Sequence, residues 1–118
     1  MKKTFLLFVS MFILCGSVFA GDELKNVTVL KDMDKPALKT YMKKLSKEIG
    51  QKCSFCHNTK DFSSDENHHK DIARKMITMT RDLNKNVFNY EGAEKVTCYT
   101  CHAGNKKPVN ELPKEEKK

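Results

Sequence analysis

The feature that most constrains this chain is a five-residue motif that occurs twice. Residues 53–57 read Cys-Ser-Phe-Cys-His and residues 98–102 read Cys-Tyr-Thr-Cys-His, so the two copies hold four of the five cysteines. We call them the first motif and the second motif. Two thiols at this spacing can bond the two vinyl groups of a haem, and the histidine that follows can bind its iron. The sequence therefore predicts two covalently attached haem c groups.

Each residue type in the motif has a separate predicted role. The predicted attachment residues are Cys53, Cys56, Cys98 and Cys101. The predicted proximal ligands of the two irons are His57 and His102.

Paired cysteines also occur in other kinds of site. Two Cys-x-x-Cys pairs can build one zinc site with four thiolate ligands, and a single pair can form a thiol redox centre or a disulfide. None of these requires a histidine directly after the second cysteine, whereas haem attachment does. The histidine in both copies therefore favours haem over zinc, thiol redox chemistry and disulfides.

The N-terminal segment has the pattern of a secretory signal peptide. Lys2 and Lys3 precede an apolar run at residues 5–14, and small residues up to Ala20 offer a cleavage point. The apolar run is shorter than the roughly 20 residues that span a bilayer. We expect cleavage after Ala20, which removes Cys15, and export to the periplasm, where haem c is attached.

The rest of the chain is predicted to be one small domain. We expect a dihaem domain at residues 21–105 and a flexible charged tail at residues 106–118, with no transmembrane segment after cleavage. The formal net charge of the 118 residues is +7, but the lysines are scattered and not interleaved with aromatic residues. We therefore predict no nucleic-acid binding. Haem is expected to supply much of the core, because so short a chain buries little on its own.

Two amphipathic helices are predicted, one before each motif. The first begins near Asp34 and ends at Gly50, and a capping box formed by Ser63 and Glu66 is expected to start the second, which runs to about Asn84, or as far as Asn89. Their apolar stripes have the same spacing, at an offset of 34 residues: Leu38, Met42, Leu45 and Ile49, then Ile72, Met76, Met79 and Leu83. The predicted fold is mostly α, with two helix-plus-motif units and few or no strands.

Further residues around the motifs carry a family resemblance. Residues 42–58 include Gly50 and Cys-Ser-Phe-Cys-His-Asn, residues 73–84 include Met-Thr-Arg-Asp-Leu-Asn, and the second motif continues as Ala-Gly up to Pro108. In this order and spacing the chain resembles two adjacent haem units of the photosynthetic reaction-centre cytochrome c subunit family. Members in reaction centres carry four haems, so the two motifs here imply a small soluble relative.

The resemblance also bears on the distal ligands. It implies that Met42, eleven residues before Cys53, is the distal ligand of the first haem. For the second haem the repeat favours Met76, which takes the place of Met42, with Met79 as an alternative. The family takes a distal histidine at the corresponding haem from elsewhere in its chain, and His68 and His69 are the candidates for that part here.

Six-coordinate haem implies electron transfer and leaves no vacancy for a substrate. We therefore expect no enzymatic activity and no catalytic residues. The expected partners are redox proteins, with a membrane-bound respiratory or photosynthetic complex among the candidates. Two alternatives remain at this stage: a dihaem peroxidase or reductase with one open iron, and a non-catalytic subunit of a larger redox complex.

Overall fold

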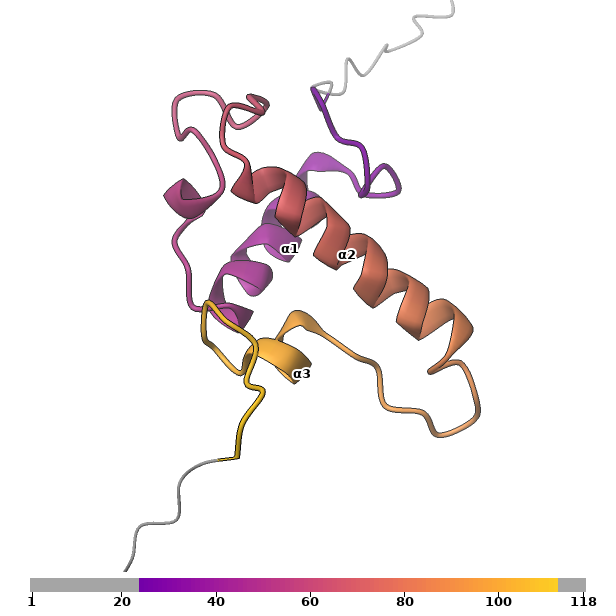
Figure 1. Ribbon diagram of the computed structural model, residues 1–118. Coiled ribbons are helices and arrows are strands. Elements are labelled where there is room, and N and C mark those ends of the chain that lie inside the picture. The colour runs from indigo at the N-terminus through magenta and orange to yellow at the C-terminus, as the bar shows by residue number, and fades with distance from the viewer. Residues whose placement is uncertain (1–23, 113–118) are drawn as a thin grey trace, which may run out of the picture.

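The computed structural model describes residues 24–112, and Figure 1 shows how its helices are arranged. The elements are α1 (Lys35–Glu48), the short 3-10 helix η1 (Cys53–Phe55), α2 (His69–Asn86) and α3 (Cys98–His102). This part of the chain contains no β-strand, only an isolated bridge between Asn58 and Asp61. The mostly α prediction is confirmed. The predicted signal peptide and the last residues of the predicted tail lie outside the described residues.

Helix α1 begins and ends where the sequence predicted. The Asp34 side chain accepts a hydrogen bond of 2.8 Å from the Ala37 backbone N–H, and Pro36 lies in the first turn, where it removes no helical hydrogen bond. After Ile49, the chain leaves the helix through Gly50, which has a φ of +61°. Glycine adopts this left-handed conformation without a steric penalty.

The predicted start of the second helix is wrong. Ser63 does not cap a helix, because its backbone N–H and its hydroxyl both donate to the Asp61 carboxylate. Helix α2 begins at His69, whose backbone N–H donates to the Asn67 side chain at 3.1 Å. The chain between the first motif and α2 is therefore a longer loop than the capping-box pattern predicted.

The second motif forms a helix of its own, which the sequence analysis did not predict. Helix α3 starts with a capping box in which the side chains of Thr97 and Thr100 each accept from the other residue's backbone N–H. It contacts both α1 and α2, and Figure 1 shows it near the end of α1. The loop before it returns to α2 because the Asn84 side chain bonds both the N–H and the carbonyl of Val96, at 2.8 and 2.7 Å.

A close backbone contact joins the chain after the second motif to the end of α1. The Gly104 N–H donates to the Glu48 carbonyl at 2.9 Å. A Cβ atom on Gly50 would lie 2.1 Å from the Gly104 carbonyl oxygen, so only glycine fits there. This contact holds the end of α3 beside the segment that leads to Cys53.

The described residues form a sparse core. Leu30 and Ile77 are the buried hydrophobic residues of this part of the chain, at 1% and 2% exposure. Within the same residues, no helix is long and apolar enough to cross a bilayer.

Candidate functional site

The first motif forms a tight turn that brings the thiols of Cys53 and Cys56 and the imidazole of His57 close together on a short stretch of backbone. Cys53 opens η1, and its carbonyl accepts from the backbone N–H groups of Cys56 and His57, at 3.3 and 3.0 Å. Cys53 is exposed, whereas Cys56 and His57 are half-buried.

The His57 ring is held by its Nδ1 atom. Nδ1 lies 3.2 Å from the Phe62 carbonyl oxygen, and the two rings are 5.3 Å apart at their centroids. A carbonyl can only accept, so Nδ1 carries the proton and Nε2 keeps a free lone pair. Burial lowers the pKa of His57, although the hydrogen bond to the Phe62 carbonyl opposes it, and the charge of Lys70 adds a smaller lowering effect. The lowered pKa favours the neutral imidazole that an iron ion requires.

The second motif shows the same arrangement on a different backbone. His102, at the end of α3, places its Nδ1 2.9 Å from the Asn105 carbonyl oxygen. Its Nε2 atom is therefore also left with a free lone pair. Ala103, which follows, adopts a φ of +47° and ends the helix, so the chain turns and brings Asn105 back to the ring. The two predicted proximal ligands thus have the same tautomer.

No disulfide joins the four motif cysteines. Burial raises the pKa of the Cys56 thiol. The pKa of Cys98 is also raised, first by burial and then by the nearby Glu48 carboxylate. These two thiols are therefore held in their neutral form at neutral pH.

The two cysteine pairs do not combine into one metal site. They lie on separate elements, η1 and α3, and residues 24–112 contain no group of three or more His, Cys, Asp or Glu side chains that could hold a metal ion. The zinc site with four thiolates is therefore not formed by these residues.

An uncovered apolar face on α2 fits a large apolar group. Ile72, Met76 and Met79, which belong to the predicted apolar stripe, are 46%, 40% and 45% exposed. The buried positions of α2 are Lys70 and Ile77, on another side of the helix. Since protein atoms cover these three side chains only in part, they can contact a macrocycle, and together with the two free Nε2 atoms this makes the residues present fit haem c.

The candidate distal methionines lie on the two long helices. Met42 is half-buried on α1, and Met76 and Met79 are exposed on α2. Met79 also lines a surface groove of about 660 Å³ between α2 and Val29. That volume is in the range of small-molecule and cofactor sites.

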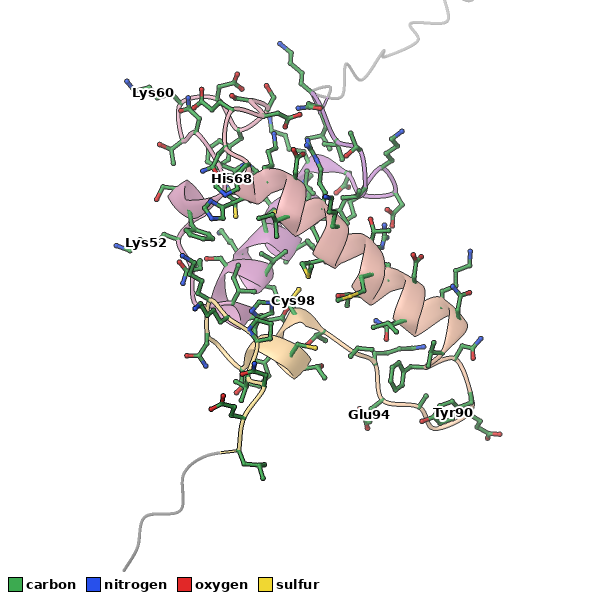
Figure 2. The ribbon with its side chains drawn as sticks, viewed as in Figure 1. Lys52, Lys60, His68, Tyr90, Glu94 and Cys98 are labelled. Atoms are coloured by element: carbon green, nitrogen blue, oxygen red, sulfur yellow. The ribbon has the colours of Figure 1, made fainter. Side chains whose placement is uncertain are left out.

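The two candidate distal histidines lie beside the first motif. His69 stacks on Phe55 with a centroid distance of 4.1 Å, and His68 stacks on His69 at 4.1 Å. Figure 2 shows His68 at the start of α2, on the side of η1. The His69 Nδ1 atom is bonded to the Asn67 side chain at 3.1 Å. The structure places this pair against the first motif, and Lys106, four residues after the second motif, lies over the same Phe55 ring at 4.7 Å.

Sequence reasoning missed the groups that orient the proximal histidines. Phe62 and Asn105 act through backbone carbonyls, which carry no sequence signal. Lys70 was also missed, because a lysine near the start of a polar helix normally faces water. Here it is only 7% exposed.

Comparison with known proteins gives a consistent match. A family model described as photosynthetic reaction centre cytochrome C subunit matches residues 12–117. Over 90 residues the chain is 40% identical to cytochrome c-554 of Chloroflexus aurantiacus, covering 72% of this chain and 21% of that protein. It is 31% identical over 91 residues to the photosynthetic reaction center cytochrome c subunit of Rubrivivax gelatinosus, covering 75% of this chain and 25% of the relative.

The photosynthetic reaction center cytochrome c subunit of Roseobacter denitrificans is 33% identical over 101 residues, covering 79% of this chain and 27% of the relative. The chain therefore spans only about a fifth to about a quarter of the length of the curated relatives it matches.

Proposed function

The chain belongs to the photosynthetic reaction centre cytochrome c subunit family, and from this membership we propose that it is an exported dihaem c-type cytochrome that transfers electrons between redox partners. The observation that carries the proposal is the repeated motif, in which both histidines donate from Nδ1 and keep Nε2 free. When bound, haem c supplies a one-electron iron couple.

The protein's own contribution is attachment, ligation and the exclusion of water. Cys53 and Cys56 would hold the first haem and Cys98 and Cys101 the second, all through thioether bonds. His57 and His102 would provide the proximal nitrogens. Met42 would provide the distal sulfur for the first iron and Met76 that for the second, with Met79 as the alternative. The repeat of the apolar stripe at an offset of 34 residues, in which Met76 takes the place of Met42, supports a methionine at the second iron.

We propose that the protein is not an enzyme. A dihaem peroxidase or reductase needs an iron with an open face, and distal methionines leave none. Carbon monoxide should therefore react slowly with the native reduced protein, and peroxide slowly with the oxidised protein. Rapid reaction of either would favour the enzymatic alternative.

Export and partner docking belong to the same proposal. A signal peptide at residues 1–20 would take the chain to the periplasm, where membrane-bound redox complexes are accessible. The family name supports a membrane photosynthetic complex as a candidate partner. Edman sequencing of the protein from the periplasmic fraction should begin at Gly21, and copurification with a membrane complex would separate a subunit from a free carrier.

The experiment that tests the haem content is mass spectrometry of the purified protein after acid-acetone extraction. The expected result is a chain mass with two covalent haems. The variants Cys53→Ala/Cys56→Ala and Cys98→Ala/Cys101→Ala should each retain one haem. A chain without covalent haem, or with bound zinc, would contradict the proposal.

A further inference from the structure

The Phe62 carbonyl oxygen is shared by two donors from different parts of the chain. The His57 Nδ1 atom approaches it at 3.2 Å, and the Lys70 Nζ atom approaches it at 3.1 Å. The ammonium group of Lys70 and the predicted proximal ligand of the first haem therefore share one acceptor atom.

Three backbone carbonyls and one carboxylate hold the Lys70 ammonium group in this position. Its Nζ atom also donates to the carbonyls of Ser63 and Ser64, at 2.9 and 2.7 Å, and pairs with the Asp65 carboxylate at 2.9 Å. Asp65 is held in turn by Arg74 at 2.9 Å. The Lys70 side chain is 9% exposed, so its charge is only weakly screened by solvent.

The second motif provides an internal reference. The Asn105 carbonyl receives the His102 Nδ1 atom at 2.9 Å, and no ammonium or guanidinium of the described residues donates to that carbonyl. The two histidines therefore have the same tautomer. They differ because the carbonyl that accepts from His57 also accepts from an ammonium group, whereas the carbonyl that accepts from His102 does not.

We propose that Lys70 is a positioning residue that orients His57 through the Phe62 carbonyl and raises the reduction potential of the first haem relative to the second. This rests on the proposed function, since it requires haem at the first motif. A carbonyl that accepts from Nδ1 makes the imidazole a stronger donor to iron, which favours the ferric state. The Lys70 ammonium draws on the same carbonyl and weakens that effect. Its positive charge also disfavours the more positive ferric centre.

The test is the substitution Lys70→Met in the mature holoprotein, which removes the charge and keeps an unbranched side chain that is only one atom shorter. Reduction of each haem is followed by NMR of assigned haem methyl signals at graded stages of reduction. The equilibrium constant for reduction of the first haem should fall about tenfold, which is about 59 mV for a one-electron couple. The second haem should change much less.

Three further variants separate this role from general effects. Lys60→Met removes an equal charge from the loop between η1 and α2, where Figure 2 shows the side chain pointing away from the body, and it should leave the first haem near its wild-type potential. Lys70→Arg keeps the positive charge, so the reduction potential of the first haem should stay close to the wild-type value and above that of Lys70→Met. Asp65→Asn loosens the same cluster without removing the lysine, and it should not lower the potential of the first haem.

A second substitution covers the case in which Lys70→Met does not fold. Lys70→Gln keeps one hydrogen-bond donor without the charge and should also lower the potential of the first haem. The NMR signal of the His57 Nδ1 proton provides a readout besides the potential, and it should shift in Lys70→Gln but not in Lys60→Met.

Two results would overturn the inference while haem binding stands. The first is an equal reduction potential of the first haem in Lys70→Gln and Lys60→Met, and the second is an equal change in the potentials of both haems in Lys70→Gln. Failure of the proposed function is distinct, because the wild-type mass would then lack a haem.

Discussion

His57 and His102 occupy the same place in their motifs, and both donate from Nδ1 to a carbonyl a few residues further along the chain. The backbone differs completely, since one follows a 3-10 turn and the other ends an α-helix. The common element is a hydrogen bond that fixes the ring and leaves Nε2 for iron. At the residue scale, the chemistry of the site depends on this bond and on the distal partner.

The first residue-scale prediction concerns Met42. Replacing Met42 with Ala should remove the thioether-to-iron absorption band and lower the potential of the first haem by on the order of tenths of a volt, because axial ligands set haem potentials over about 0.8 V. Optical redox titration measures both. An unchanged spectrum would show that another residue holds the distal position.

The second residue-scale prediction separates Met76 from Met79. Each is replaced singly by Leu, which roughly conserves volume. Met76→Leu should turn the second haem high-spin or lower its potential, whereas Met79→Leu should leave the EPR and optical spectra unchanged. The reverse pattern would assign the ligand to Met79. If only the removal of His68 or His69 perturbs the second haem, its ligation is bis-histidine.

At the scale of elements, contacts between segments position the motifs. Lys70 and Arg74 of α2 both bind Asp65 in the loop that follows the first motif, and Arg74 also donates to the Asn26 carbonyl at 3.3 Å. Gly50 and Gly104 bring the ends of α1 and α3 together. These two junctions join elements far apart in the sequence.

The Asp65 junction predicts an acid-dependent stability. Hydrogen bonds from Arg74, and then from Asn26 and Lys70, hold the pKa of Asp65 well below its usual range. The folded protein therefore binds this proton less readily than the unfolded chain does, where the pKa is about 3.9. The stabilisation is fully present above that value and is lost as the pH falls toward the folded pKa.

The measurement is the melting temperature of wild-type and Asp65→Asn protein between neutral pH and about pH 3. The wild-type advantage should be largest at neutral pH and shrink on acidification. Glu94→Gln, a change in the exposed loop labelled in Figure 2, should give no such pH-dependent difference. An advantage that stays constant with pH would contradict the assignment.

The Gly50 junction predicts a steric effect on stability. Gly50→Ala combines a left-handed backbone with a Cβ atom 2.1 Å from the Gly104 carbonyl oxygen. Gly92 has a φ of +78°, and a Cβ atom added there would meet nothing within 4 Å, so Gly92→Ala isolates the backbone cost of roughly 1–2 kcal/mol. Gly50→Ala should destabilise by about 1–3 kcal/mol more, measured by chemical denaturation. Equal losses of unfolding free energy in Gly50→Ala and Gly92→Ala would show that the segment after α3 moves aside without cost.

At the scale of the whole molecule, the main feature is how little of the chain buries itself. The described residues contain two buried hydrophobic side chains, Leu30 and Ile77, and leave the apolar stripe of α2 open. A small domain usually requires a cofactor, metal or disulfide under these conditions. The proposed haems would supply the missing apolar contacts.

This predicts that the chain depends on haem for cooperative folding. A variant with all four motif cysteines changed to Ala should show reduced helical circular dichroism and no sharp thermal transition. The two variants with one intact motif should be intermediate. A cooperative transition like that of the holoprotein in the four-cysteine variant would show that the protein core is sufficient.

The sequence alone determined the features that depend on neighbouring residues. The two motifs predict haem attachment because the spacing of cysteine and histidine is itself the chemical requirement. The bounds of α1 followed from Asp34, Pro36 and Gly50, which act on the nearest turn of backbone. The periodicity of α2 correctly predicted a helix, but it could not say that the apolar stripe would remain open.

Only the tertiary structure decided the features that depend on the path of the irregular loops. Helix α2 starts at His69 and not near Ser63 because the loop before it is bonded to Asp61, Asn67 and Lys70 instead of forming a helical turn. The carbonyls that orient the two histidines are supplied by the path of the backbone, and Lys70 is buried because three carbonyls and a carboxylate surround its charge. A local pattern reports the period of a segment, whereas these contacts depend on the three-dimensional path of loops that have no period.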